Sequence, residues 1–377
     1  MTGKGRRAGN AMRQIVKSIG AAALALSLLT GVAEAQSKKE VYVYNWSDYI
    51  DFKILEDFTK ETGIQVIYDT YDSNDLLETK LMAGKTGYDV VVPTSNFLAR
   101  EIKAGVIAPL DKSKLPNLKN LDPAIMQRMA AYDPGNAHGV VYMWGTSGIG
   151  YNAKKVAERM PNAPVDSLAL LFDPAVAAKF KDCGIMVLDA ADELIPAALR
   201  YLGLNPDAKD AESIARAEAA LLKVRPYIRK FHSSQYIEDL ANGAICIAFG
   251  FSGDIVQARQ RAKDAKKGVE IVYSVPKEGA LMWFDNLAIP KDAPNKDNAH
   301  AFINYMLRPE VIARASNAVF YPNANKDADR FVDKEVKADK GVYPPPEVVK
   351  TLFTVTPYDQ ASQRALTRSW TKVKRGK

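Results

Sequence analysis

Short apolar segments that alternate with helical patterns constrain the fold of this chain more than any other feature of its sequence. Val41–Tyr44, Ile64–Tyr68 and Tyr88–Val92 are apolar runs of strand length, and a helical pattern that ends at a glycine follows each run. The third run stops at a proline, as is typical of a strand buried on both faces of a parallel sheet. The alternation therefore predicts an α/β protein whose parallel strands are joined by right-handed helical crossovers.

The alternation is interrupted once and then begins again, which indicates two lobes. Val140–Tyr151 is extended and rich in glycine, so it could cross between lobes and flex. A mature chain of 342 residues also exceeds what one compact core usually holds. We expect residues 36–144 and 276–320 to form the first lobe and residues 145–275 the second. Residues 321–377 would be a C-terminal segment that packs across both lobes.

Residues 1–35 have the three parts of a secretion signal. A basic start precedes an apolar stretch that is too short for a comfortable membrane span, and Ala33-Glu34-Ala35 offers a cleavage site. The alternative is a retained N-terminal anchor. Removal of residues 1–35 takes away five basic residues and one acidic residue, so the net charge falls from +7 to +3. Since the remaining Lys and Arg residues are scattered, we expect no nucleic-acid partner.

The chain has two cysteines, Cys183 and Cys246, and both lie next to predicted strands. An exported chain with an even number of cysteines favours a disulfide between them. Two buried free thiols are the alternative.

Aromatic rings and acids occur together in three short segments that are far apart in the sequence: Tyr44–Tyr49, Phe249–Asp254 and Trp283–Asp285. The first two lie where predicted strands end, which is where open α/β sheets bind their ligands. A ring face attracts a cation, and a carboxylate accepts its N–H bonds. The combination therefore predicts a site for a small organic cation. Core packing or helix capping is the alternative for each of these residues taken singly.

Other chemistries have less support. The three histidines lack the spacing of metal ligands, and neither a dinucleotide loop nor a P-loop is present, so we expect no metal and no cofactor. Ser252 lies in a Gly-x-Ser-Gly segment, which lacks the glycine placement of the Gly-x-Ser-x-Gly motif of a hydrolase nucleophile. Asp254 and Asp285 could serve glycoside hydrolysis, which keeps an exported hydrolase as a minor alternative. An amino-acid ligand would need an arginine for its carboxylate, and no predicted cleft segment supplies one.

At these residues the chain resembles the periplasmic polyamine-binding proteins of bacterial ABC importers, above all the putrescine-binding branch. The resemblance runs from about residue 38 to the C-terminus, and five segments carry it: Tyr44–Tyr49, Asp89–Thr94, Phe231–Gly243, Tyr321–Lys326 and Arg368–Lys374. It implies a type II periplasmic-binding-protein fold, in which two α/β lobes joined by hinge strands close on the ligand. It also implies a periplasmic location, and the two cysteines match the positions of a family disulfide.

The resemblance implies a set of ligand-binding residues. Glu193 would bind one ammonium group, and Asp254 with Asp285 would bind the other. The full set is Trp46, Ser47, Asp48, Tyr49, Ser95, Asn96, Glu193, Ser233, Phe251, Asp254, Trp283, Asp285 and Tyr321. Phe251 stands where the family commonly has tryptophan, whereas Trp283 resembles the spermidine-binding branch. The resemblance to the putrescine-binding branch as a whole leads us to expect putrescine as the ligand, with spermidine next.

From these observations we expect a monomeric receptor that is not an enzyme. It would capture the ligand by closure about Val140–Tyr151 and Ile271–Pro276 and deliver it to an ABC permease in the membrane. A binding protein for another small solute, such as agmatine, an amino acid or a sugar, is the alternative.

Overall fold

The computed structural model describes residues 39–377, and Glu40–Lys377 forms one compact unit. The signal peptide predicted at residues 1–35 lies outside the described residues. Among residues 39–377, no helix combines the length and the apolar character that a membrane crossing needs.

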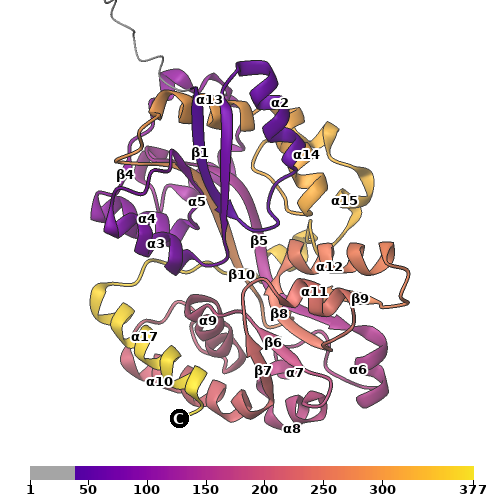
Figure 1. Ribbon diagram of the computed structural model, residues 1–377. Helices are drawn as coiled ribbons and strands as arrows, with labels where there is room; N and C mark the ends of the chain where they lie inside the picture. Colours follow the sequence, from indigo (N-terminus) through magenta and orange to yellow (C-terminus); the bar gives the residue numbers. More distant parts are fainter. Residues whose placement is uncertain (1–38) are drawn as a thin grey trace, which may run out of the picture. The chain divides into compact units, whose positions relative to one another are not determined.

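Within the described residues, ten strands form one mixed sheet (Figure 1). Along its main path the order is β2-β1-β3-β10-β5-β8-β6-β7, while β4 pairs with β10 and β9 pairs with β5. The strands are β1 (Glu40–Trp46), β2 (Gln65–Tyr71), β3 (Val90–Val91), β4 (Ile107–Ala108), β5 (Gly139–Asn152), β6 (Ile185–Val187), β7 (Ile228–Phe231), β8 (Ile247–Phe251), β9 (Ile271–Ser274) and β10 (Leu281–Pro290).

Pairing is parallel toward both ends of the sheet and antiparallel in its middle. β1 pairs in parallel with β2 and β3, and β6 pairs in parallel with β7 and β8. These pairs confirm the parallel strands predicted from the alternating pattern. β5 and β10 pair with antiparallel register, from Leu281 opposite Ser147 to Ala288 opposite Gly139. The predicted parallel pairing therefore does not extend to the centre of the sheet, where β5 and β10 run in opposite directions.

Helices cover the sheet, and several end where the sequence predicted. Asp51 caps the start of α2, and Gly63 and Gly105 end α2 and α4 with φ of 71° and 72°, which only glycine adopts readily. The helices are α2 (Phe52–Thr62), α3 (Asn74–Ala83), α4 (Ser95–Ala104), α5 (Pro123–Met129), α6 (Ala153–Arg159), α7 (Ala169–Phe172), α8 (Pro174–Ala177), α9 (Ala191–Tyr201), α10 (Ala211–Val224), α11 (Tyr236–Ala241), α12 (Ser252–Asp264), α13 (Lys296–Met306), α14 (Pro309–Val319), α15 (Lys334–Ala338), α16 (Pro346–Val349) and α17 (Gln360–Arg375).

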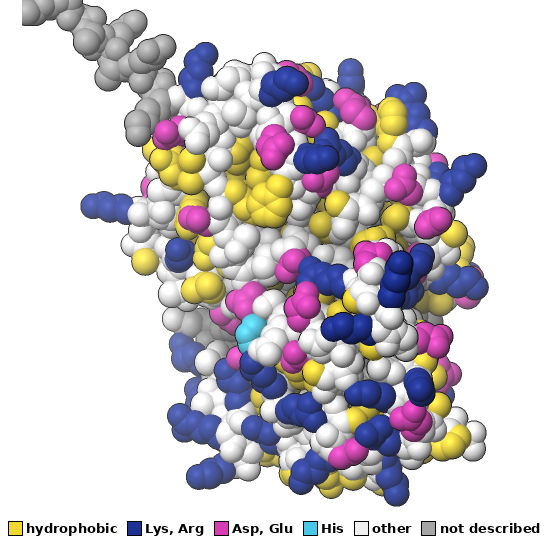
Figure 2. All heavy atoms as spheres, turned by 45° about the vertical axis from the view of Figure 1, so that its right-hand side comes forward, with side chains coloured by type: hydrophobic (Ala, Val, Ile, Leu, Met, Phe, Trp, Pro, Cys, Tyr) yellow, Lys and Arg dark blue, Asp and Glu magenta, His cyan; other side chains and the backbone are white. Residues whose placement is uncertain are grey.

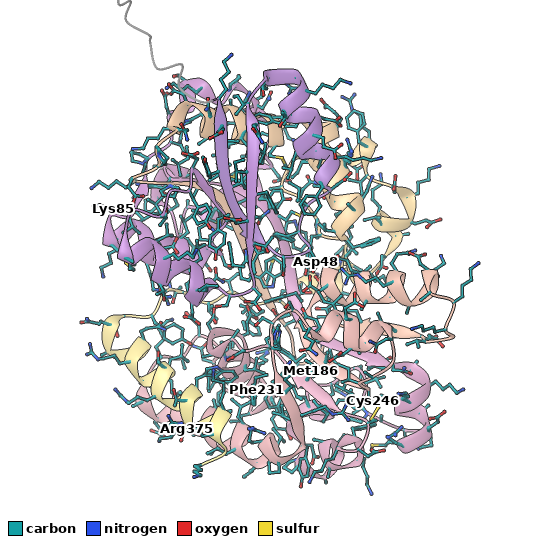
Figure 3. The ribbon with its side chains drawn as sticks, viewed as in Figure 1. Asp48, Lys85, Met186, Phe231, Cys246 and Arg375 are labelled. Carbon is teal, nitrogen blue, oxygen red and sulfur yellow. A yellow bond between two sulfur atoms is a disulfide. The ribbon has the colours of Figure 1, made fainter. Side chains whose placement is uncertain are left out.

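Buried apolar side chains form two core clusters. The first core is built mainly from β1, β3, β10, α2, α13 and α14, and the second core mainly from β6, β8, α9, α10 and α17. β5 contributes to both, since Tyr142 lies in the first core and Ile149 in the second. In the second core, Met186 is buried and Phe231 packs at its margin (Figure 3). The two cores are consistent with the predicted lobe boundaries, which remain a proposal.

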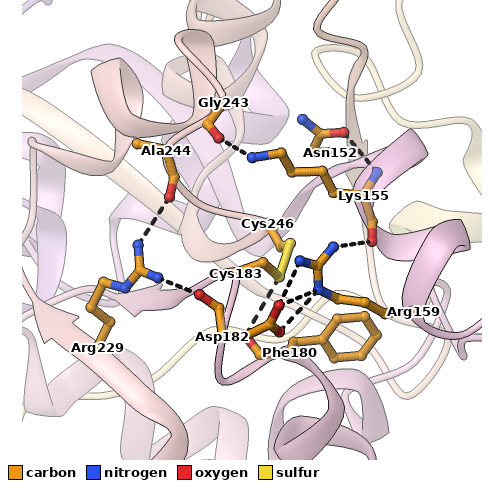
Figure 4. Close-up of a disulfide and its surroundings, with 10 residues drawn as sticks. All are labelled: Asn152, Lys155, Arg159, Phe180, Asp182, Cys183, Arg229, Gly243, Ala244 and Cys246. Atoms are coloured by element: carbon orange, nitrogen blue, oxygen red, sulfur yellow. Dashed lines mark hydrogen bonds and ion pairs between the residues drawn. A yellow bond between two sulfur atoms is a disulfide. The ribbon is translucent and has the colours of Figure 1, made fainter.

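A disulfide joins Cys183 to Cys246, as the sequence predicted, with Cα atoms 5.5 Å apart (Figure 4). It connects the turn before β6 to the turn before β8. The Arg229 guanidinium bridges the same two turns by donating to the carbonyl oxygens of Asp182 and Ala244, each at 2.9 Å. A covalent closure of this span stabilises a fold by about 4 kcal/mol in the chain-entropy description. The turns beneath the second core are therefore held both covalently and by hydrogen bonds.

Candidate ligand-binding site

One pocket, with about 450 Å³ of atom-free space, brings together ten of the thirteen predicted site residues. No lysine or arginine belongs to its described lining. The lining residues are Trp46, Ser47, Tyr49, Asp72, Asn74, Thr94, Glu193, Ser233, Phe251, Asp254, Trp283, Asp285 and Tyr321. Most of them follow the carboxyl end of a strand, so the topology of the sheet gathers residues that are distant in sequence.

Asp254 lies in the first turn of α12, directly after β8 ends at Phe251. Its two carboxylate oxygens accept the hydroxyls of Tyr236 and Tyr321, both at 2.7 Å. Each hydroxyl oxygen already accepts a backbone N–H, from Phe251 and from Asp254 itself, so each hydroxyl hydrogen points at the carboxylate. Burial raises the pKa of Asp254 to about 6, against the lowering effect of the two tyrosine hydroxyls.

Asp285 interrupts the apolar strand β10 at a register irregularity and is 4% exposed. Its oxygens accept the Thr94 hydroxyl at 2.6 Å and the Tyr49 hydroxyl at 2.9 Å. The Thr94 oxygen itself accepts from the Asn74 amide at 2.9 Å, which directs its hydrogen to Asp285. Burial raises the pKa of Asp285 to about 7, and the two hydroxyls oppose that rise.

Glu193 lies in the first turn of α9 and is 6% exposed. Its Oε2 atom has no hydrogen-bond partner within the described residues. Burial, followed by the neighbouring charge of Asp192, raises the pKa of Glu193 to about 8, and only the Ser147 hydroxyl opposes the rise. Among the three buried acids of the pocket, Glu193 is therefore the one that most lacks a donor.

Aromatic rings surround the acids and contact one another in sequence. The ring centroids lie 6.3 Å apart for Trp46 and Phe251, 5.5 Å for Phe251 and Trp283, 5.5 Å for Trp283 and Tyr321, and 5.1 Å for Tyr321 and Tyr49. Three of these contacts are edge-to-face and the Trp283–Tyr321 contact is tilted, and such contacts fix ring orientation. The pocket thus presents ring faces between acids, which suits a cation with an apolar body.

Two glycines let these rings approach the backbone. A Cβ atom at Gly253 would stand 2.4 Å from the Tyr321 ring, and one at Gly145 would stand 2.6 Å from the Trp283 ring. Any larger residue would push the ring into the pocket or away from its partner. These positions therefore shape the site although neither glycine lines it.

Three predicted residues lie outside the lining of this pocket. Asp48 pairs instead with Arg261 of α12 at 2.6 Å, and Figure 3 shows it beside this helix. The Ser95 hydroxyl donates to the carbonyl of Phe284, and the Asn96 amide donates to Asp192. Ser95 and Asn96, at the start of α4, line a smaller neighbouring cavity, and the preceding Thr94 lines both this cavity and the pocket.

Sequence reasoning missed Asp72, Asn74 and Thr94 as lining residues and Tyr236 as the partner of Asp254. The first two follow the end of β2, and Thr94 follows the end of β3. The rule that placed Trp46 and Phe251 at strand ends would also have found them. Tyr236 gave no such signal, since it lies in a short helix.

On one face of Glu40–Lys377, acidic side chains lie at mid-height among some Lys and Arg side chains, and Lys and Arg side chains predominate below them (Figure 2). The acids of the pocket can attract a small cation and accept its N–H groups.

Comparison with known proteins gives consistent results. The family model for bacterial extracellular solute-binding proteins matches residues 53–344. The putrescine-binding periplasmic protein SpuD of Pseudomonas aeruginosa is 52% identical over 367 residues, which are 96% of this chain and 100% of that protein. The putrescine-binding periplasmic protein PotF of Escherichia coli is 51% identical over 361 residues, 95% of this chain and 97% of that protein. A solved putative spermidine/putrescine ABC transporter from Listeria monocytogenes has a TM-score of 0.80 at 32% identity, covering 89% of this chain and 99% of that chain.

Proposed function

The chain belongs to the family of bacterial extracellular solute-binding proteins, and from this premise we propose that it is a periplasmic receptor for putrescine or a closely related polyamine. One observation carries the proposal: Glu193, Asp254 and Asp285 are buried around a ring-lined pocket whose described lining has no cationic side chain. Buried carboxylates are costly unless a cation compensates them. A linear diamine supplies that charge at both ends and an apolar chain between them.

The expected affinity follows from the contacts that such a ligand would make. Each charged hydrogen bond contributes roughly 1.5–3 kcal/mol, and a desolvated cation–π contact adds up to about 2 kcal/mol. Four buried methylenes contribute about 3 kcal/mol in total at ~0.8 kcal/mol each. Since association entropy offsets several kcal/mol, a binding free energy of about −8 kcal/mol results, which corresponds to micromolar affinity or better.

Capture would couple to closure of the two lobes. Asp285 lies on β10 beside the first core, whereas Glu193 and Asp254 lie on α9 and α12 beside the second. A dication that contacts all three acids binds the closed arrangement better than a separated one, and so shifts the population toward it. We propose that the closed monomer is the form that an ABC permease recognises, and that residues 1–35 direct export.

Similarity to two putrescine-binding proteins supports the proposed choice among amines, and two rings of the pocket can adjust it. Phe251 is smaller than tryptophan and leaves more room beside Trp283, where its ring lies 5.5 Å away. Trp283 can stack along a methylene chain. We propose that putrescine is preferred and spermidine is the next ligand, with agmatine as the alternative solute.

Calorimetry with putrescine, spermidine, agmatine, a sugar and an amino-acid panel tests the proposal. We expect micromolar or tighter binding of putrescine and no heat with the sugar or the amino acids. Mass spectrometry of the recovered ligand should find it unchanged, because the receptor is proposed to bind without chemistry. Binding of a neutral sugar or an amino acid in preference to every amine would overturn the proposal.

A further inference from the structure

The pocket contains more buried acids than a ligand with a single ammonium group can neutralise. Glu193, Asp254 and Asp285 are buried, and Asp72, the fourth acid of the lining, is half-buried. No lysine or arginine stands in the described lining to compensate these acids. Since an uncompensated buried charge is strongly unfavourable, a buried acid that meets no ammonium group is expected to take up a proton.

The hydroxyl groups around the acids indicate which acid takes up the proton. Four hydroxyls, those of Tyr236, Tyr321, Tyr49 and Thr94, donate one hydrogen bond to each oxygen of Asp254 and Asp285. Three of these hydroxyl oxygens already accept an N–H group, so their hydrogens have no other direction. A protonated aspartic acid would turn one of its oxygens into a donor against such a hydrogen. The hydroxyls therefore favour the carboxylate form of both aspartates, and most of all that of Asp254, where neither hydroxyl can reverse.

Glu193 has no comparable set of donors. Its Oε2 atom lacks a partner, and the Ser147 hydroxyl is the one group that favours its charged form. The charged or titratable groups that face it are Asp192 from α9, Asp285 from β10 and Tyr273 from β9, and none is a cation. Burial and these neighbours raise the pKa of Glu193 to about 8, the highest value among the three acids.

Resting on the proposed amine receptor, we propose that Glu193 exchanges a proton according to the head group it meets, so that the pocket binds a second class of ligand. This class comprises primary amines that carry a neutral polar group, such as a hydroxyl, four carbons from the nitrogen. The amine binds at Asp254 and Asp285 in both classes. A second ammonium group meets ionised Glu193, and a neutral hydroxyl meets Glu193 in its acid form, whose O–H donates to the hydroxyl oxygen.

Proton balance gives the two classes opposite pH dependence. Binding of a diamine releases the Glu193 proton to solvent, so the affinity for the diamine increases as pH rises. An amino alcohol requires that proton, so its affinity falls over the same range. Titration of the two aspartates affects both ligands alike and cancels in the ratio of their affinities. Below about pH 8.5 the ligand amines, with pKa near that of lysine, stay mainly protonated.

The test compares putrescine with 4-amino-1-butanol, which replaces one ammonium group by a hydroxyl. Dissociation constants are measured by calorimetry between about pH 6 and about pH 8.5 on the wild type, on Glu193→Gln and on the control Asp192→Asn. We expect the preference of the wild type for putrescine to grow at least about tenfold across this range, as displacement of one proton allows. Glu193→Gln is neutral at every pH and should lose this pH dependence. At the upper pH it should bind putrescine about tenfold or more weakly than the wild type. At the lower pH its affinity for 4-amino-1-butanol should stay within about threefold of the wild-type value.

Asp192→Asn should retain the pH dependence with a lower midpoint, because Asp192 helps to raise the pKa of Glu193. Melting curves report whether each variant is folded. A ratio that does not change with pH in the wild type, or the same pH dependence in Glu193→Gln, would overturn this inference while leaving the amine receptor intact. If neither amine binds the wild type at any pH, the proposed function itself fails.

Discussion

Replacing Asp285 by asparagine distinguishes whether this acid serves ligand binding or the stability of the fold. The change keeps the shape of the side chain and removes its charge. Because hydrogen bonds to a charged partner contribute roughly 1.5–3 kcal/mol, loss of one such bond to an ammonium group predicts about ten- to hundredfold weaker putrescine binding.

The same substitution should not weaken the ligand-free protein. Burial raises the pKa of Asp285 to about 7, above the value of about 3.9 expected in the unfolded chain. A raised folded-state pKa means that the ionised acid opposes folding as pH rises from about 4 to about 7, by up to about 4 kcal/mol at neutral pH. Asparagine has no such charge. Although it satisfies the Thr94 and Tyr49 hydroxyls less well, the melting temperature should therefore be unchanged or higher.

The assay pairs calorimetry with melting curves at about pH 7.5, where Asp285 is mainly ionised. Asp166→Asn serves as control, since this exposed acid pairs only with Lys277 at 3.5 Å and lies away from the pocket lining. The control should bind putrescine as the wild type does. Wild-type affinity in Asp285→Asn would refute the role of this carboxylate. A loss of affinity together with a markedly lower melting temperature would refute the claim that the acid serves binding at the expense of stability.

Four further outcomes are expected. The melting temperature without ligand should fall as pH rises from about 5 to about 8, because burial raises the folded-state pKa values of the three buried pocket acids. Saturating putrescine should reduce that fall, and a melting temperature that does not change with pH in either condition would contradict this prediction. Phe251→Trp should change the ratio of putrescine to spermidine affinity measured by calorimetry, and an unchanged ratio would show that this ring does not sort ligands. Gly253→Ala should weaken putrescine binding about tenfold, because the new Cβ displaces the Tyr321 ring, and a wild-type dissociation constant would argue against that contact. Reduction of the Cys183–Cys246 disulfide should lower the free energy of unfolding in urea by up to about 4 kcal/mol with little change in affinity; a large loss of affinity would indicate that the bond also shapes the pocket.

Several parts of the site could be read from local sequence. Asp285 was recognisable because a charge inside an apolar strand needs a partner, and it is buried against two hydroxyls. Trp46 and Phe251 were recognisable because they stand where strands end, and both line the pocket. Thr94 was overlooked in favour of its neighbours Ser95 and Asn96, since a strand end gives the place but not the direction of each side chain.

The alternation of strands and helices, the glycine stops and the joint occurrence of rings with acids were determined by the sequence itself, because each depends on residues within one or two turns of the chain. Tertiary structure alone decided which hydroxyl meets which carboxylate. Tyr49 and Asp285 are 236 positions apart, and Tyr321 and Asp254 are 67 apart. Contacts at such separations depend on how the sheet brings strand ends together and on the rotamer that packing allows each ring. For the same reason Glu193 emerged as the acid without a donor only once its surroundings were folded around it.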